Sequence, residues 1–444
     1  MFAAILQASM PARQSREWSF MSAQRYDTPE PFTIDIPERV LADLDERLRK
    51  TRWPVAVGGV AQKGPWEYGT DLDVLRAIVD HWRHGYDWRQ AEAALNRFPQ
   101  YLVDIGAQRI HFIREPGTAI EGGLLPVPLI LSHGWPGSTM EFAGLIDKLA
   151  HPENHGGNPL DAFDVVVPSL PGYGFSGPPM RQKDGAGEWM AGPIGPRAIA
   201  RLWHALMHDA LNYRRAYGAQ GGDWGSIIAS WLAFDHPGDA ASEEEKPGVM
   251  GLHLNMMVMR PGIDMATTAF SAEEADWLKR ATATRDRETA YQRINATKPQ
   301  TIAPALTDSP VGMLAWIIEK FHGWGDCHGD LLARFTMDQL ITNAMIYWVN
   351  ANMGTASWLY RGVMEEKSIA LPLGKKVEVP TGFLSFPADL APPPPRAWLE
   401  RAYNLRRFTS MGKGGHFAAL EEPDALVEDI REFFRPLRLG AAND

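Results

Sequence analysis

Two periodicities govern the apolar positions of the chain. Between about residues 108 and 235, short continuous apolar runs, typical of fully buried strands, alternate with stretches in which apolar residues recur at helical spacing. This alternation predicts an α/β fold, with a mostly parallel sheet flanked by helices on both faces. The strands are expected at 108–113, 127–132, 163–168, 214–220, 376–386 and 405–409, and a closing helix over 424–434.

The segment before this alternation has its own pattern. Residues 32–36 alternate like a strand, and a helix with Leu41, Leu44 and Leu48 on one face is expected to follow Pro37. A second stripe at helical spacing predicts core packing, and it consists of Leu72, Leu75, Ile78, Val79 and Trp82.

The alternation stops after Pro237. Residues 247–370 are mostly helical in pattern and carry no buried-strand run, which predicts a helical cap inserted over the site. The expected divisions are 1–24, a disordered tail; 25–107, an amino-terminal region wrapping the core; 108–245, the first part of the core; 246–372, the cap; and 373–444, the second part of the core.

Composition narrows the range of partners. The 444 residues carry a net charge of −10 without any block of lysine and arginine, which argues against nucleic acid or an anionic membrane as a partner. No stretch approaches ~18 consecutive apolar residues, so no membrane anchor is expected. The single cysteine, Cys327, fits a reducing compartment, and we expect a cytoplasmic location, although the mildly apolar residues 2–8 leave secretion open. Asp326 and His328 beside it lack the second ligand pair of a zinc site, so no metal is expected.

The stretch Gly221-Gly222-Asp223-Trp224-Gly225 lies between a predicted strand and a predicted helix. Its glycine spacing matches the GxSxG nucleophile elbow, with Asp223 in place of the serine. A carboxylate is ionised at neutral pH and displaces a leaving group from an sp³ carbon without a base, which favours alkyl transfer over acyl transfer. Taken alone, the stretch fits equally well a glycine-rich turn with a capping aspartate.

Two later residues complete a candidate triad. Asp389 follows the strand predicted at 376–386, and His416 lies in a glycine loop after the strand predicted at 405–409. The carboxyl ends of parallel strands meet at one edge of the sheet, so Asp223, Asp389 and His416 are expected to lie together. Nucleophile, acid and histidine follow one another in the order of an α/β-hydrolase triad.

Several motifs make a resemblance specific. They are HGWPGS after one predicted strand, PGYGFSG after the next, GAQGGDWGS at the elbow, TKPQT and DSPVGMLAWIIEKF in the insertion, GGHFAALEEP near the end, and PFTIDIPERVLADLDERLRKTRWP at the start. Over residues 30 to 437 the chain resembles the epoxide hydrolases of the microsomal type. The resemblance implies an α/β-hydrolase fold with an inserted helical cap, and an enzyme that converts an epoxide and water to a vicinal diol.

The resemblance also implies roles for individual residues. Asp223 matches the nucleophile, His416 the general base and Asp389 the acid that orients the base, while Tyr291 and Tyr360 match the pair of cap tyrosines. The match around Tyr360 is poorer. Chemistry explains the tyrosines, because opening an epoxide leaves an alkoxide that needs a proton or strong hydrogen bond, and a neutral phenol supplies it.

Hydrolysis of the resulting ester on Asp223 creates an oxyanion that requires N–H donors. The backbone N–H groups of Trp135 and Trp224 are the candidates. In this fold one donor comes from the residue after the nucleophile, and the other comes from the loop after an early strand. No cofactor is implied. The expected partners are an apolar epoxide, favoured by the many Trp, Met and Phe residues of the cap, and water, with a homodimer left open. Detoxification and aromatic hydrocarbon catabolism are the processes that the resemblance suggests.

Other functions use the same fold. A haloalkane dehalogenase also has an elbow aspartate followed by tryptophan, but a departing halide needs no proton, so Tyr291 and Tyr360 would be superfluous. An esterase is disfavoured because Ser226 lies on the helix and not at the centre of the elbow. A non-catalytic binding or scaffold protein would be expected to have lost part of the triad. Two departures from the family pattern, the missing anchor and Asp389 where some members have glutamate, leave the expected function intact.

Overall fold

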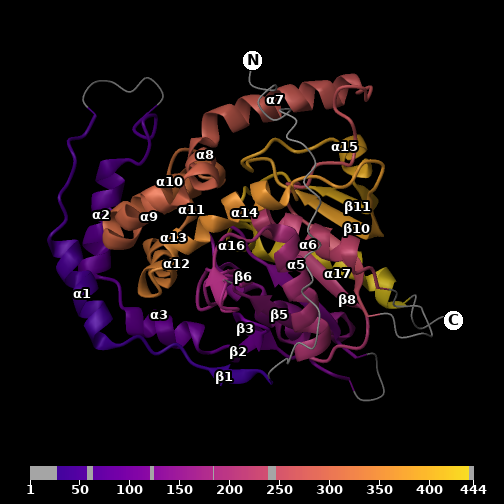
Figure 1. Cartoon of the computed structure of the whole chain (residues 1–444), viewed down its shortest axis with the longest axis horizontal. Helices are drawn as coiled ribbons and strands as arrows, with labels where there is room; N and C mark the ends of the chain where they lie inside the picture. Colours follow the sequence, from indigo (N-terminus) through magenta and orange to yellow (C-terminus); the bar gives the residue numbers. More distant parts are fainter. Residues whose placement is uncertain (1–27, 58–63, 121–124, 184, 239–246, 440–444) are drawn as a thin grey trace.

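The computed structural model describes residues 28–57, 64–120, 125–183, 185–238 and 247–439, so the predicted tail 1–24 lies outside the described residues. Within them, nine strands form one sheet in the order β1-β2-β3-β5-β4-β8-β9-β10-β11 (Figure 1). Their bounds are β1 Glu30–Phe32, β2 Gln100–Ile105, β3 Gln108–Glu115, β4 Val127–Ser132, β5 Phe163–Pro168, β8 Tyr217–Gly221, β9 Val249–Leu254, β10 Val377–Ser385 and β11 Tyr403–Ser410. A separate hairpin consists of β6 Met180–Lys183 and β7 Trp189–Ala191.

The sheet is parallel from β5 to β11, and β1, β2 and β3 join it in antiparallel pairs. This arrangement confirms the predicted α/β-hydrolase fold with a mostly parallel sheet. In register, Ser132 of β4 lies opposite Gly221 of β8, and Gly221 lies opposite Leu254 of β9. The carboxyl ends of β4, β8 and β9 therefore stop at one level, directly below the elbow.

Helices cover both faces of the parallel strands. Leu129 and Leu131 of β4 pack in one apolar cluster with α4 and α17, whereas Ile130 between them packs in the other cluster, on the side of α5 and α6. Because alternate side chains of β4 point into two different cores, the strand appears in the sequence as a continuous apolar run. The core helices are η1 Thr139–Gly144, α4 Ile146–Ala150, η2 Pro152–His155, η3 Pro159–Asp161, α5 Pro196–Ala205, η4 Leu206–Ala210, α6 Asp223–Asp235, α15 Arg396–Glu400, α16 Ala418–Glu421 and α17 Pro423–Leu439.

The cap consists of helices between β9 and β10, and the amino-terminal helices lie beside it (Figure 1). Its helices are α7 Ala272–Glu288, α8 Ala290–Thr297, α9 Pro299–Asp308, α10 Pro310–Trp324, α11 Leu331–Arg334, α12 Met337–Val349, α13 Met353–Ala356 and α14 Trp358–Glu366. The amino-terminal helices are α1 Glu38–Arg49, α2 Leu72–His84 and α3 Trp88–Leu95.

Polar contacts join the amino-terminal helices to the cap. His81 of α2 pairs with Asp338 of α12 at 2.7 Å, and Arg47 of α1 pairs with Asp308 of α9 at 2.6 Å. Meanwhile β1 and β2 extend the sheet. The amino-terminal region thus links the edge of the sheet to the cap, while the domain boundaries given above stay a prediction.

Three local predictions were wrong. The segment after Pro237 does contain a buried strand, β9, which lies in the middle of the sheet within the range assigned to the cap. The strand predicted at 32–36 ends at Phe32. The strand predicted at 108–113, the first of the expected series, is β3, which follows two other strands and runs antiparallel to its neighbours.

No single helix in the described residues is long and apolar enough to cross a membrane; α9 and α10 reach that length only as a pair, which is bent by 115°. The same residues contain no group of three histidine, cysteine, aspartate or glutamate side chains placed to hold a metal ion.

Candidate active site

Asp223 stands at a sharp turn between β8 and α6. A Cβ atom on Gly225 would lie 1.8 Å from the carbonyl oxygen of Ser132, and a Cβ on Gly221 would lie 2.3 Å from the backbone of Gly225. Glycine at these two positions therefore lets α6 start directly against β4 and β8. Asp223 itself has φ of 46°, in the left-handed region that costs a non-glycine residue about 1 kcal/mol or more. The turn thus has the sharp strand-to-helix shape that the glycine spacing predicted.

The predicted triad residues lie together. His416 Nδ1 is 2.7 Å from Asp389 Oδ1, and His416 Nε2 is 3.6 Å from Asp223 Oδ2. A short bridge between Ala388 and Gly415 aligns the loop after β10 with the loop after β11, which sets the distance between acid and imidazole.

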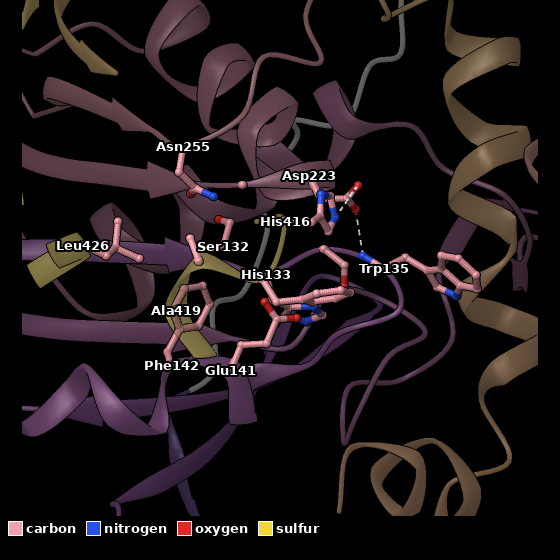
Figure 2. A pocket seen from close by; sticks show the side chains of 14 residues that line it. Ser132, His133, Trp135, Glu141, Phe142, Asp223, Asn255, His416, Ala419 and Leu426 are labelled. Carbon is pink, nitrogen blue, oxygen red and sulfur yellow. Dashed lines mark hydrogen bonds and ion pairs between the residues drawn. The ribbon is translucent and has the colours of Figure 1, made fainter. Parts of the chain in front are cut away.

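Two backbone N–H groups hold the carboxylate of Asp223. The N–H of Trp135 donates to Asp223 Oδ1 at 2.8 Å (Figure 2), and the backbone N–H of Trp224 lies close enough to lower the pKa of the same carboxyl. Both candidate oxyanion donors are therefore directed at Asp223. Because one oxygen is held by Trp135, the other, Oδ2, is the oxygen that faces His416.

Burial and charge set the protonation of the triad. Burial by itself lowers the pKa of His416, but the charge and hydrogen bond of Asp389 and the charges of Asp223 and Glu141 outweigh it and raise the pKa to about 9. Burial raises the pKa of Asp223, and His416 together with the two N–H donors opposes that rise. We assign the proton of this pair to His416, so the free site at neutral pH holds a carboxylate beside an imidazolium.

The two cap tyrosines approach the same carboxylate. Tyr291 of α8 and Tyr360 of α14 have ring centroids 5.7 Å apart, and both are buried. Burial, together with the charge of Asp223, raises the pKa of Tyr291, and the pKa of Tyr360 is raised well above its ordinary value by burial, by Tyr291 and by Asp223. Both phenols are therefore neutral donors at physiological pH.

Aromatic rings and one cation surround these phenols. Tyr291 stacks on Trp135 at 4.8 Å, and Tyr360 meets Trp224 edge to face at 4.7 Å. The ammonium of the buried Lys320 lies 4.6 Å from the ring centroid of Tyr291. Lys320 also pairs with Glu319, whose charge adds to the rise in the pKa of Tyr291. A cation over a phenol ring stabilises the phenolate relative to the phenol, so Lys320 acts in the opposite direction.

The loop that carries Trp135 is fixed from the cap. Asn343 Nδ2 of α12 donates to the carbonyl oxygen of Pro136 at 2.7 Å, and the Tyr347 hydroxyl donates to that of Gly137 at 2.6 Å. His133 Nε2 accepts from the N–H of Leu170 at 3.1 Å, and burial lowers the pKa of His133 to about 4. His133 is thus a neutral imidazole that joins two loops.

Sequence reasoning identified the residues with a local signature and missed Lys320, Asn343, Tyr347 and Glu141. In the sequence, Ser138 and Glu141 have the spacing of a capping box. In the structure Ser138 Oγ accepts from Met140 instead, over a 3₁₀ helix, and Glu141 lines the cavity beside Asp223. Lys320, Asn343 and Tyr347 lie in the cap. The TKPQT and DSPVGMLAWIIEKF motifs mark the cap, but no spacing rule shows which of its side chains point inward.

Comparisons with known proteins show which family the chain resembles. The family profile described as "Epoxide hydrolase N terminus" matches residues 29–142, and the profile "alpha/beta hydrolase fold" matches residues 127–242. The chain is 34% identical over 428 residues to "Epoxide hydrolase 1" of Sus scrofa, covering 91% of this chain and 88% of that protein. Among solved structures, it resembles the epoxide hydrolase of Aspergillus niger (TM-score 0.73, 30% identity, 93% and 97% of the two chains) and the juvenile hormone epoxide hydrolase of the silkworm Bombyx mori (TM-score 0.74, 31% identity, 93% and 95%).

Proposed function

The chain belongs to the epoxide hydrolases of the microsomal type, hydrolases that act on ether bonds, and on that premise we propose a two-step mechanism through a covalent ester on Asp223. The observation that carries the proposal is the placement of one carboxylate between two backbone N–H donors, an imidazole 3.6 Å away and two neutral cap phenols.

The first step opens the epoxide. Oδ2 of Asp223 attacks a ring carbon, because Oδ1 is held by the N–H of Trp135. A bond forms between Oδ2 and that carbon, and the carbon–oxygen bond of the ring breaks. The departing oxygen takes a proton from Tyr291 or Tyr360, whose neutral hydroxyls supply it without prior ionisation. The product is an alkyl ester beside a tyrosinate.

The second step hydrolyses the ester. Ester formation removes the charge of Asp223, and with it part of the cause that keeps His416 protonated. The imidazolium of His416 returns a proton to the tyrosinate and becomes a base. Water then gives a proton to Nε2 and attacks Cγ of Asp223. The oxyanion forms on Oδ1, where the N–H groups of Trp135 and Trp224 stabilise it. Cleavage between Cγ and Oδ2 releases the diol, which takes the proton held by His416.

The surroundings favour an apolar epoxide. Trp135, Trp224 and Trp324 pack against the tyrosine pair, and such aromatic walls gain more from burying alkyl or aryl groups than polar ones. We expect styrene-type and aliphatic epoxides to exceed glycidol-type epoxides in kcat/KM.

The test is a panel of epoxides and matched chloroalkanes, followed by diol and chloride assays with the purified chain. Diol formation from epoxides, with chloride release at the background level, is expected. Chloride release without diol would instead identify a haloalkane dehalogenase, in which the departing halide needs no proton from Tyr291 or Tyr360.

The covalent step is tested with His416→Ala. This variant is expected to form the ester and fail to hydrolyse it, so intact-mass spectrometry should show one substrate adduct, mapped to Asp223 by peptide analysis. Normal substrate binding without an adduct would contradict the two-step route.

A further inference from the structure

The mechanism above leaves one carboxyl in the active-site cavity without a role. Glu141, on the 3₁₀ helix η1, lines the same cavity as Asp223 and His416 (Figure 2). Its carboxyl is close enough to both for their charges to act on its pKa, and in its ionised form it raises the pKa of His416. Glu141 is therefore part of the electrostatic surroundings of the ester, although it is not one of the predicted site residues.

The position of this carboxyl is built by its neighbours. A Cβ atom on Gly137 would lie 1.1 Å from Glu141 Oε1, so the glycine leaves the space that the carboxyl fills. The backbone N–H of Ser138 lies close enough to lower the pKa of the carboxyl, which has lone pairs to accept from a further donor. The flanking side chains of Met140 and Phe142 are buried.

The cavity itself has room for about one water molecule. Its volume is about 20 Å³, and a water needs at least ~10 to 15 Å³ together with two to four polar partners. Asp223, His416 and Glu141 are three such partners from three different segments of the chain. A water that attacks Cγ of Asp223 must occupy a cavity of this kind, between the carboxyl carbon and the imidazole.

We propose that Glu141 positions the hydrolytic water, accepting one hydrogen bond from it while His416 accepts the other. This inference rests on the proposed ester route. The water has two O–H groups and must direct a lone pair at Cγ. When Nε2 of His416 takes one hydrogen and an oxygen of Glu141 accepts the other, both are directed away from the carbonyl. The proton transferred goes to His416, and Glu141 gains none.

The protonation of Glu141 is consistent with this role. Burial, with the charge of Asp223, raises the pKa of Glu141 to about 8 against the opposing effects of His416 and Ser138. A neutral carboxyl still has a carbonyl oxygen that accepts, and it adds no negative charge beside an ester carbonyl that is about to become an oxyanion. The side chain is thus an acceptor that does not compete with His416 as the base.

The experiment compares Glu141→Ala, Glu141→Gln and the wild-type chain in single-turnover, rapid-quench kinetics with a styrene-type epoxide. Ester formation and ester hydrolysis are followed separately by intact mass. Glu141→Ala should slow hydrolysis roughly 10-fold to 100-fold, so that the ester accumulates, and should leave ester formation within about 2-fold. Glu141→Gln keeps a carbonyl acceptor and should restore most of the hydrolysis rate. Asp147→Ala, which removes a half-exposed carboxylate from the following helix, is the matched control and should change neither rate.

Gly137→Ala provides a second test, because it displaces the carboxyl of Glu141 without removing it. It should slow hydrolysis in the same way, and a circular-dichroism melting curve for each variant checks that the fold is retained. Equal slowing by Glu141→Ala and Glu141→Gln would overturn the acceptor role, because it would mean that an ionisable group is required. Slowing of both chemical steps, or of neither, would overturn it as well.

Failure of the inference and failure of the proposed function give different results. If the wild-type chain turns over epoxide without any ester on Asp223, the two-step route itself is wrong. If the ester forms and Glu141→Ala hydrolyses it at the normal rate, the route stands and Glu141 has no part in positioning the water.

Discussion

The charge of Asp223 should control the protonation of His416, and Asp223→Asn tests this directly. Asparagine has the shape of the aspartate but not its charge, so it resembles the neutral ester. The carboxylate and the imidazolium lie 3.6 Å apart. At an effective dielectric constant of ~20, the attraction between the two charges at that separation is roughly 5 kcal/mol, which raises the pKa of the imidazole by roughly 3.

The variant should therefore lower the pKa of His416 from about 9 toward the ordinary value of an imidazole, ~6.5, while Asp389 at 2.7 Å still supports the imidazolium. The sign follows from the charge, because loss of a nearby anion makes the imidazolium less stable and releases its proton at lower pH. In the catalytic cycle the same change makes His416 a base once the ester has formed. Ester hydrolysis should accordingly increase with pH around a midpoint well below 9.

The assay is an NMR pH titration of ring-labelled histidine, with the His416 signal assigned from its absence in His416→Gln. Intact mass must show that the amide at position 223 has survived, because the site is built to activate water against a carbonyl there. Asp147→Asn, which removes a surface charge, should leave the signal of His416 unchanged. If the wild-type chain and Asp223→Asn titrate at the same pH, the charge of Asp223 does not hold the proton on His416.

Three further substitutions test the cap and the elbow. Tyr291→Phe should slow ester formation about 10-fold or more and leave ester hydrolysis nearly unchanged, since Tyr360 remains as the second donor; single-turnover kinetics measure both, and the opposite order would remove Tyr291 from ring opening. Lys320→Met should slow ester formation roughly 5-fold, the equivalent of a ~1 kcal/mol cation–π contact, and an unchanged rate in the same assay would deny it that influence. Gly225→Ala should lower the free energy of unfolding by about 3 kcal/mol, because its Cβ would lie 1.8 Å from the Ser132 carbonyl oxygen; urea denaturation that shows no loss would contradict the packing argument.

The parts of the site that the sequence predicted are those with local signatures. Gly221 and Gly225 mark the elbow by their spacing, and strands were expected before Asp389 and His416, at 376–386 and 405–409. The parallel sheet then brings three distant segments to one edge. Spacing and topology together were therefore sufficient to predict that Asp223, Asp389 and His416 lie close together.

The parts that the sequence did not reveal depend on long-range contacts. β9 contains Gly251 and His253, which are poor indicators of a buried strand. His253 is buried because it pairs with Asp429 at 3.0 Å, and Gly251 is required because a Cβ there would lie 2.6 Å from Leu437. Both partners lie in α17, more than 170 residues later. The position of Glu141 in the cavity was missed for the same reason, since Asp223 and His416 are distant from it in sequence.

The central claim is that an oxygen of Asp223, and not of bulk water, becomes the new oxygen of the diol. A single turnover in H₂¹⁸O, with enzyme in excess over epoxide, tests it by mass spectrometry of the diol and of the peptide that contains Asp223. The proposed route predicts unlabelled diol and one ¹⁸O atom in the carboxylate of Asp223, because water attacks Cγ and the bond to Oδ2 leaves with the product. Labelled diol with an unlabelled Asp223 would contradict the account, since it would mean that water attacks the epoxide directly.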